Sequence, residues 1–292
     1  MQYSAVALLV GATLGFELSA QTPVPIIAVL EHPQCAKDST LAVRPLFVKS
    51  HGSWTALSTA EKSGVVDLRS MNWTVAFDGR SLGSITTDDP GFTSRNESSY
   101  PRDRRLTIRN NVRSPTIANT ERAFAGWCSS PLTRPLALIS PANVKDPDLW
   151  KPFTPGPSVR ERLFRDFKKR AGRAVRCPEN PTKAVPFKYT AMNIVVGTGY
   201  RDRMGRALIA LRLDDRMNEC DGPTGEAWAT QWFLLADGVH PLGRSLELVN
   251  AGDYDADGRS EILFWYSGYN EDGYTLFYSD FNRHLDFRWS YH

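Results

Sequence analysis

The chain has 292 residues, and its 35 Lys and Arg against 32 Asp and Glu give a formal net charge of only +3. This balance provides no global field for nucleic acid or for an anionic membrane, so we expect no nucleic-acid partner. The charged fraction of 23% and the apolar fraction of 41% are those of an ordinary globular protein with a buried core.

Residues 1–20 predict a secretory signal peptide. An apolar run from Ala5 to Phe16 is followed by the small residues Ser19 and Ala20, which suit cleavage after Ala20. Because no Lys or Arg precedes the run, a buried first strand or helix is the alternative. The run is too short to cross a bilayer comfortably, and no later apolar stretch is long enough. We therefore expect a secreted or periplasmic protein without a transmembrane segment.

Four cysteines remain after that cleavage: Cys35, Cys128, Cys177 and Cys220. None lies in a C-x-x-C pair or beside a histidine at zinc-like spacing. In an oxidising compartment an even number favours two disulfides, for which three connectivities are possible. We favour Cys35–Cys128 and Cys177–Cys220, because each pair then stays within one half of the chain. Four free buried thiols are the alternative if the signal peptide is absent.

Residues 21–150 predict a β-rich N-terminal region. Strand-like segments alternate there with turn residues; they are 24–31, 53–57, 72–77, 84–87, 104–110 and 135–140. The polar, turn-rich stretch from Thr87 to Arg105 predicts a long surface loop.

Residues 151–182 predict a Pro-rich linker and a helix. The prolines of DPDLWKPFTPGPS, Asp146 to Ser158, are typical of a linker. A helix is expected from Ser158 to Ala174, with Ser158 and Glu161 at capping-box spacing. Its thin apolar stripe consists of Val159, Leu163, Phe167 and Ala171. The remaining face has seven Lys or Arg against two acids, so it suits an anionic polymer or lipid, although such faces are usually only solvated.

Residues 183–292 return to a β pattern. Strand candidates recur roughly every 10 to 16 residues, as expected for antiparallel meanders in a sandwich or propeller. They are 188–200, 206–215, 229–237, 244–250, 261–269, 273–280 and 285–292. The predicted fold class is therefore all-β, with antiparallel, β-propeller-like meanders and one basic amphipathic helix inserted.

The stretch NAGDYDADGRSEILFW, Asn250 to Trp265, gathers several carboxylates in one loop. Ionised carboxylates this close repel one another, and a hard divalent cation that takes six to eight oxygens removes the repulsion. Gly258 allows the sharp turn that such a loop needs. We predict a Ca²⁺ site rather than a Mg²⁺ site, because Mg²⁺ keeps its waters and prefers few carboxylates. The expected ligands are Asp253, Asp255, Asp257, Glu261 and the backbone carbonyl of Arg259.

The spacing differs from that of an EF-hand, whose twelfth position is a glutamate on a helix; here, counting from Asp253, that position is Phe264 in a strand-like run. Asp253 to Glu261 resembles instead the calcium loop of FG-GAP (VCBS-type) repeats, as in integrin α-subunit propellers. In those repeats D-x-D-x-D-G-x-x-D joins two strands of one blade, and Glu261 replaces the last aspartate. The resemblance covers about residues 246–291, where Asp272-Gly273 is expected to form the next hairpin turn. It implies a structural calcium ion and a propeller-like blade. No second complete copy of the loop occurs in the sequence.

Signs of catalysis are weak. Gly79 to Gly83 matches G-x-S-x-G, but no helix is expected after Ser81, and a hairpin through Asp78-Gly79 explains the glycines more simply. We therefore favour a non-enzymatic binding or scaffold module with a protein or carbohydrate ligand. The alternative is an extracytoplasmic hydrolase, possibly on glycans, with two carboxylates roughly 5 to 9 Å apart or a serine within reach of a histidine. The sequence does not indicate an oligomeric state.

The C-terminal strands are dense in aromatic residues. Because alternate residues of a strand face opposite sides of a sheet, one set is expected in the core, while the other could meet a sugar or a protein. We favour core packing. The rings belong to Phe264, Trp265, Tyr266, Tyr269, Tyr274, Phe277, Tyr278, Phe287, Trp289 and Tyr291.

Overall fold

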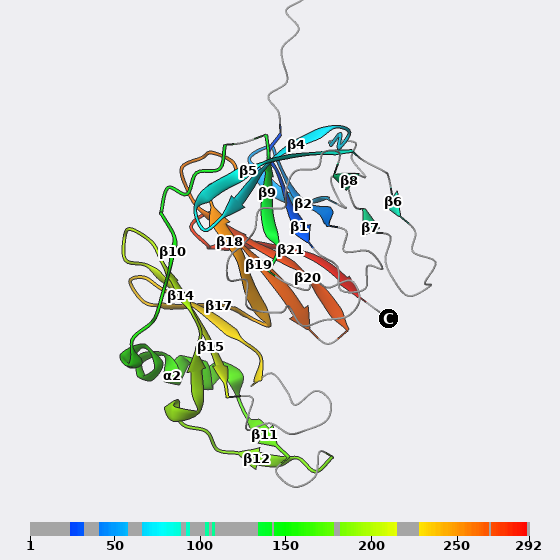
Figure 1. Ribbon diagram of the computed structural model, residues 1–292. Coiled ribbons are helices and arrows are strands. Elements are labelled where there is room, and N and C mark those ends of the chain that lie inside the picture. Colours follow the sequence, from blue (N-terminus) through cyan, green and yellow to red (C-terminus); the bar gives the residue numbers. More distant parts are fainter. Residues whose placement is uncertain are drawn as a thin grey trace, which may run out of the picture.

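The computed structural model describes residues 24–31, 41–57, 66–88, 134–141, 143–177, 182–214, 228–268 and 270–290, and the short strands 92–93, 103–104 and 107–108. Within these residues the chain is all-β with antiparallel sheets and one α-helix, so the predicted class is confirmed. Figure 1 shows the N-terminal sheet above, the C-terminal sheet in the middle, and a third sheet with the helix at the lower left. The predicted signal peptide lies outside the described residues.

The N-terminal sheet has seven strands in the order β3-β2-β1-β9-β4-β5-β8. They are β1 (Ile26–Glu31), β2 (Ala42–Ser50), β3 (Ser53–Ala56), β4 (Met71–Phe77), β5 (Arg80–Asp88), β8 (Thr107–Ile108) and β9 (Leu136–Ser140); β6 (Phe92–Thr93) pairs separately with β7 (Asp103–Arg104). Both faces of β1 are buried. Ile27 and Val29 enter one core cluster, and Ile26 and Ala28 enter another, because alternate side chains point to opposite faces.

The sheet from the middle of the chain carries the helix. Its strands are β10 (Lys151–Phe153), β13 (Ile194–Val196), β14 (Gly199–Arg201), β15 (Ala207–Leu213), β16 (Gln231–Leu235) and β17 (Val239–Arg244). Helix α2 (Pro157–Ala171) buries Leu163, Phe167 and Ala171 in the core cluster of this sheet. The 3-10 helix η1 (Ala191–Asn193) contacts α2, and β11 (Ala174–Arg176) pairs with β12 (Val185–Phe187).

The C-terminal sheet is a four-stranded meander in sequence order: β18 (Leu246–Gly252), β19 (Glu261–Gly268), β20 (Glu271–Tyr278) and β21 (Arg283–Ser290). This is the strand number and order of a propeller blade, whereas the other two large sheets have seven and six strands among the described residues. Leu263 and Trp265 of β19 pack against the N-terminal sheet, and Ile262 and Phe264 pack against the middle sheet. The C-terminal sheet therefore has a core cluster on each face, and its aromatic residues serve mainly as core, as favoured from the sequence.

Arg134 connects all three sheets. Its guanidinium donates to the carbonyl of Val249 on β18 (2.8 Å), to the hydroxyl of Tyr200 on β14 (3.1 Å) and to the carboxylate of Asp78 after β4 (2.8 Å). It also lies over the ring of Phe77, 4.3 Å from the ring centre. One side chain thus fixes the junction at which the three sheets meet.

Two predictions for the helix are wrong: its capping box and its end at Ala174. The helix begins at Pro157 with Gly156 as its N-cap and no side-chain cap, so the Ser158–Glu161 capping box does not form. Proline suits the first helical position, because a backbone N–H at that position would have no partner inside the helix and proline has none. With Pro157 in the first position, Ser158 lies within the first turn and not at the N-cap. The helix ends at Ala171 because Gly172 takes a positive φ of 66°. The expected linker also contains strand β10, paired with β14, and the fully buried Trp150.

The prediction of a hairpin turn at Asp272-Gly273 is also wrong. Gly268 pairs with Glu271, so the turn lies three residues earlier, and Asn270 there has a φ of 56°. Gly273 lies within β20 instead, where a Cβ would collide with the carbonyl oxygen of Phe287 on β21. The hairpin expected at Asp78-Gly79 is confirmed: it joins β4 to β5, and both residues have positive φ.

Cys177 is buried and takes part in a disulfide. The other three cysteines lie outside the described residues, so the predicted pairing stays a prediction. The loop expected from Thr87 to Arg105 also falls largely outside them. Among the helices that are described, none combines the length and the hydrophobicity needed to span a bilayer.

Candidate metal centre

The acidic loop connects β18 to β19, the first two strands of the C-terminal sheet. β18 ends at Gly252 and β19 begins at Glu261, so Asp253 to Ser260 form the connection. Ala256 (φ 61°) and Gly258 (φ 88°) take left-handed conformations, which curl the chain. Gly258 does so at low cost because it has no Cβ.

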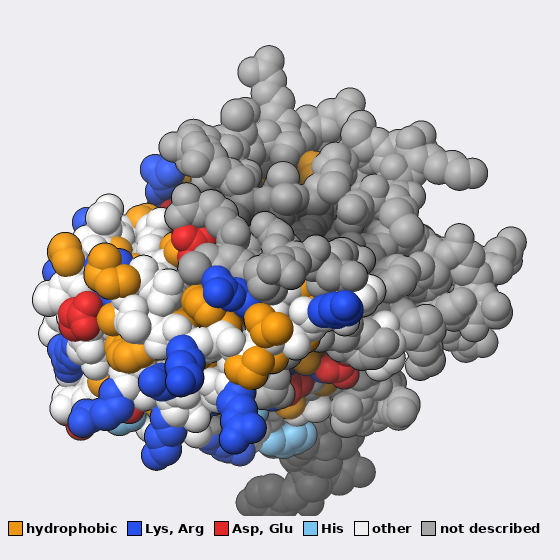
Figure 2. Space-filling view, turned by 90° about the horizontal axis from the view of Figure 1, so that it is seen from below, with side chains coloured by type: hydrophobic (Ala, Val, Ile, Leu, Met, Phe, Trp, Pro, Cys, Tyr) orange, Lys and Arg blue, Asp and Glu red, His pale blue; other side chains and the backbone are white. Residues whose placement is uncertain are grey.

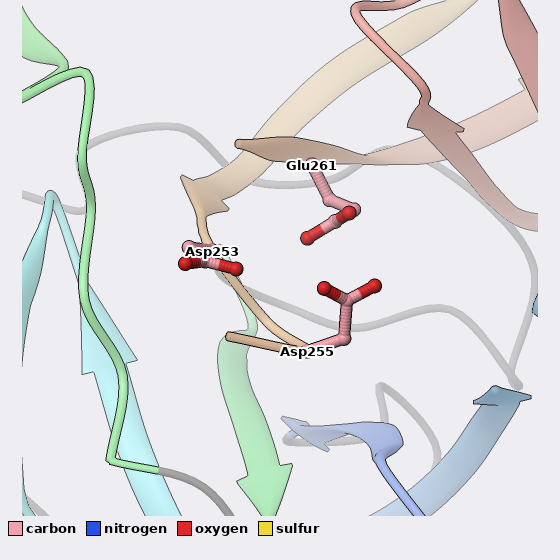
Figure 3. A group of neighbouring side chains, drawn as sticks. All are labelled: Asp253, Asp255 and Glu261. Carbon is pink, nitrogen blue, oxygen red and sulfur yellow. The ribbon is translucent and has the colours of Figure 1, made fainter. Parts of the chain in front are cut away.

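Three carboxylates converge inside this curl. Asp253, Asp255 and Glu261 each place an oxygen within 4.8 Å of the others. Figure 3 shows the three groups pointing toward a common space, with Glu261 at the start of its strand and the aspartates in the loop. Asp253 is 5% exposed, Glu261 is 2% exposed, and the side chain of Asp255 is 1% exposed. The centre is therefore a buried, oxygen-only cluster.

Of the other two predicted ligands, Asp257 lies outside the cluster. The carboxylate of Asp257 is 43% exposed and accepts the backbone N–H of Arg259 at 2.9 Å. The side chain of Arg259 is exposed and lies 3.4 Å from the carboxylate of Asp280. The role expected for the Arg259 carbonyl oxygen stays a prediction. Of the four carboxylates that the spacing predicted as ligands, the structure brings three together, Asp253, Asp255 and Glu261.

Backbone N–H groups hold the two loop aspartates in place. The carboxylate of Asp253 accepts the N–H groups of Asp257 and Gly258, both at 3.0 Å, and that of Asp255 accepts the N–H of Asp257 at 3.1 Å. Each carboxylate oxygen has two lone pairs, so these bonds leave acceptor capacity facing the cluster. The curl is built by the same side chains that would hold a cation.

The pKa of Glu261 shows the effect of the neighbouring negative charges and of burial most clearly. One of its oxygens accepts the N–H of Tyr254 at 2.9 Å. Burial, followed by the negative charge of Asp255, raises the pKa of Glu261 to about 9. Burial also raises the pKa of Asp253, although hydrogen bonds from the loop oppose it. Without a cation, Glu261 is therefore protonated at neutral pH.

Lys49 of β2 also reaches the loop, although no feature of the sequence predicted it. Its ammonium group contacts the carboxylate of Asp255 and lies 3.4 Å from that of Asp257. Burial alone would lower the pKa of Lys49, but the contacts with Asp255 and Asp257 outweigh it and raise the pKa. Lys49 is 206 residues from Asp255 in sequence. No local pattern could have paired them, and β2 itself was not expected.

The segment before β10 holds the two ends of the loop. The N–H of Asp253 donates to the carbonyl of Lys145 at 2.6 Å, and the hydroxyl of Ser260 donates to the carboxylate of Asp146 at 3.1 Å. Asp146 is 5% exposed and also accepts the N–H groups of Asp148 and Trp150. These contacts connect the loop to a segment more than 100 residues earlier in the chain.

The residues considered for other chemistry have structural surroundings. Ser81 lies on β5 directly after a tight hairpin turn and follows no strand-to-helix elbow. The aromatic residues of the C-terminal sheet are mostly core: Phe264, Trp265 and Tyr274 are at most 1% exposed. No aromatic side chain is found among the large exposed hydrophobic residues of the described segments.

Comparison with protein-family models, with curated proteins and with solved structures finds no match for this chain.

Proposed function

We propose that this chain is an extracytoplasmic β protein that binds Ca²⁺ in the loop between β18 and β19 and acts as a non-enzymatic binding or scaffold module. The observation that carries the proposal is the convergence of Asp253, Asp255 and Glu261, with oxygens within 4.8 Å of one another and side chains almost fully buried. Buried charges require partners, because removing them from water is costly.

The chain supplies too little positive charge of its own at the loop. Binding of a cation by all four carboxylates requires Glu261 to lose its proton; Asp253, Asp255, Asp257 and Glu261 then carry four negative charges, and Lys49 returns one, which leaves a formal −3. A divalent cation would reduce this to −1. The donor set consists of carboxylate oxygens, which hard cations prefer, and a loop with several carboxylates suits Ca²⁺ better than Mg²⁺.

The ion would be structural. It would join the end of β18 to the start of β19 and hold the loop against β2 and the segment 143–150. The FG-GAP-like spacing supports this role, and the four-stranded meander that carries the loop has the order of a propeller blade. A protein or carbohydrate ligand is proposed for the module on the same resemblance. No observation in the described residues favours the hydrolase alternative.

Calorimetry tests the ion directly. Wild-type protein freed of metal with EDTA and dialysed should take up one Ca²⁺, with a dissociation constant on the order of 10⁻⁴ to 10⁻³ M, as is typical of extracellular modules. Asp255→Asn should lose this binding, because it removes a central charged ligand. Asp237→Asn removes the same charge from a side chain that is 91% exposed and lies outside the loop, so it should bind as wild type does. Equal heats for wild type and Asp255→Asn would contradict the proposal.

A further inference from the structure

Positive charge is concentrated in one part of this chain. Residues 151–213, from β10 to the end of β15, hold 15 Lys and Arg against 4 Asp and Glu, a formal charge of +11. The whole chain has +3, so the rest carries −8. Such an asymmetry concentrates positive potential in one part of the chain even where the net charge is small.

Helix α2 presents a row of these charges to solvent. Its buried side, Leu163, Phe167 and Ala171, faces the sheet. An α-helix turns by about 100° per residue, so Arg162, Arg165 and Lys169 lie on the opposite side, spread over about 10 Å of the helix axis. All three are exposed. The row is therefore linear and directed away from the core.

Further basic side chains surround the row. Figure 2 looks from the end at which Figure 1 places α2, β11 and β12, and its coloured area shows many Lys and Arg side chains but few acidic ones. Exposed basic residues on or next to α2 and β12 are Lys168, Arg170, Arg173, Lys183 and Lys188. The row is the centre of a wider basic surface.

These charges are not used to stabilise the fold. Among the residues that the structure describes, no carboxylate lies within ion-pair distance of Arg162, Arg165 or Lys169. Less exposed arginines behave differently: Arg134 pairs with Asp78, and Arg206 pairs with Asp148. The row is thus available to an external anion.

We propose that the row Arg162–Arg165–Lys169 is a docking surface for a linear anionic polysaccharide, one that carries carboxylate or sulfate groups along its length. This names a ligand class for the binding role proposed above and rests on that role, but it uses a surface separate from the acidic loop. A straight row of exposed cations is complementary to a chain with repeated negative charges. Arginine also binds such oxyanions through two parallel hydrogen bonds.

A membrane surface fits less well. An interfacial helix inserts an apolar face, but the apolar face of α2 is buried in the protein. The large exposed hydrophobic residues of the described segments lie on four separate elements or turns, as Leu149, Val185, Met192 and Met204.

Single-stranded nucleic acid also fits less well, because its bases stack on exposed rings. The rings near α2 are occupied. Tyr189 packs against both Phe164 and Phe187. Lys168 lies over the ring of Phe164, and Arg176 lies over the ring of Phe187. The charged row is present without a stacking platform.

The test uses full-length protein and heparin as the probe. Arg162→Ala/Arg165→Ala/Lys169→Ala keeps the helix, since alanine is the best helix former. The control Arg69→Ala/Arg80→Ala/Arg283→Ala removes three exposed charges elsewhere and gives the same net charge. We expect the helix variant to bind heparin roughly 100-fold more weakly than wild type at low salt, about fivefold for each charge. The control should stay close to wild type.

Three outcomes would overturn the proposal: equal loss in both variants, no loss in the helix variant, or stronger binding of duplex DNA or of phosphatidylserine vesicles than of heparin at equal charge and salt. Circular dichroism checks that both variants fold. Heparin binding is also measured with EDTA and with Asp255→Asn. Both treatments should leave heparin binding unchanged, because the row is separate from the acidic loop. A wild-type protein that binds heparin through the row but takes up no calcium would defeat the calcium proposal alone. A wild-type protein that takes up calcium but whose heparin binding does not depend on the row would defeat the proposal for α2 alone.

Discussion

Glu261 combines burial with the strongest charge crowding in the loop. Its pKa of about 9 in the fold exceeds its ordinary value of 4.5, so the metal-free fold holds a proton that the unfolded chain has released between these two pH values. The stability that comes from protonation of Glu261 in the fold is fully present below about pH 4.5 and is lost as the pH rises toward 9. The shift of Asp253 has the same direction.

We therefore expect the free energy of unfolding in EDTA to fall between about pH 5 and pH 9, by up to about 1.4 kcal/mol per pH unit. Urea unfolding across this range measures it. Glu261→Gln keeps an acceptor for the Tyr254 N–H but cannot ionise, so its profile should be much flatter. Parallel profiles for wild type and variant would show that Glu261 is ionised in the metal-free fold.

Lys49 lies where an incoming cation must compete. Its ammonium contacts Asp255, one of the three central carboxylates. Lys49→Gln should therefore strengthen Ca²⁺ binding about tenfold, equivalent to about 1.4 kcal/mol, while lowering the stability of the metal-free protein. Calorimetry gives the affinity. The matched control is Lys183→Gln, which changes an exposed lysine far from Lys49 in sequence. Unchanged affinity would mean that Lys49 and the ion occupy the loop together.

The residue scale also shows how much of the site a sequence can predict. Asp253, Asp255 and Glu261 lie within nine residues, so their convergence follows from local curl and alternation. Lys49, Lys145 and Asp146 approach through sheet packing, which leaves no local signal. Asp257 fits the spacing equally well, yet it turns outward to accept the N–H of Arg259.

At the scale of elements, Arg134 shows how three sheets depend on one side chain. Its side chain is 12% exposed, and its guanidinium donates hydrogen bonds to groups on β18, β14 and the β4–β5 turn. Arg134→Ala should destabilise the protein by about 3 kcal/mol, because it leaves Asp78 and a carbonyl without their partner. Urea unfolding measures this loss. Arg69→Ala, from a solvent-exposed pair with Asp67, should change the stability far less; equal losses would contradict the role given to Arg134.

The elements that the sequence predicted best are those with a strong pattern and no competing signal. β9, β15, β16 and β19 are apolar runs flanked by turns, and each was expected. β2 was missed because Pro45 lies inside it, and proline is rare within sheets. The register shifts where Pro45 pairs with Ala28, and this irregularity accommodates the proline. The capping box failed because Pro157 begins the helix one residue earlier.

At the scale of the whole molecule, the acidic loop is more than a connection between β18 and β19. Lys49 joins it to the N-terminal sheet, and Lys145 and Asp146 join it to the segment that leads into β10. The composition and the strand pattern predicted the all-β class, but not this arrangement, because contacts between sheets depend on packing over more than 100 residues of sequence.

We therefore expect Ca²⁺ to protect distant strands together. At a free concentration of ten times the dissociation constant, binding adds about 1.4 kcal/mol to the stability of every unit that must open to release the ion. Hydrogen exchange read by mass spectrometry should slow in β2, β18, β19 and residues 143–150. It should change little in α2, which contacts the loop through none of the bonds described above. Asp255→Asn should show no slowing anywhere, and slowing confined to 253–261 would mean that the ion orders the loop without coupling the sheets.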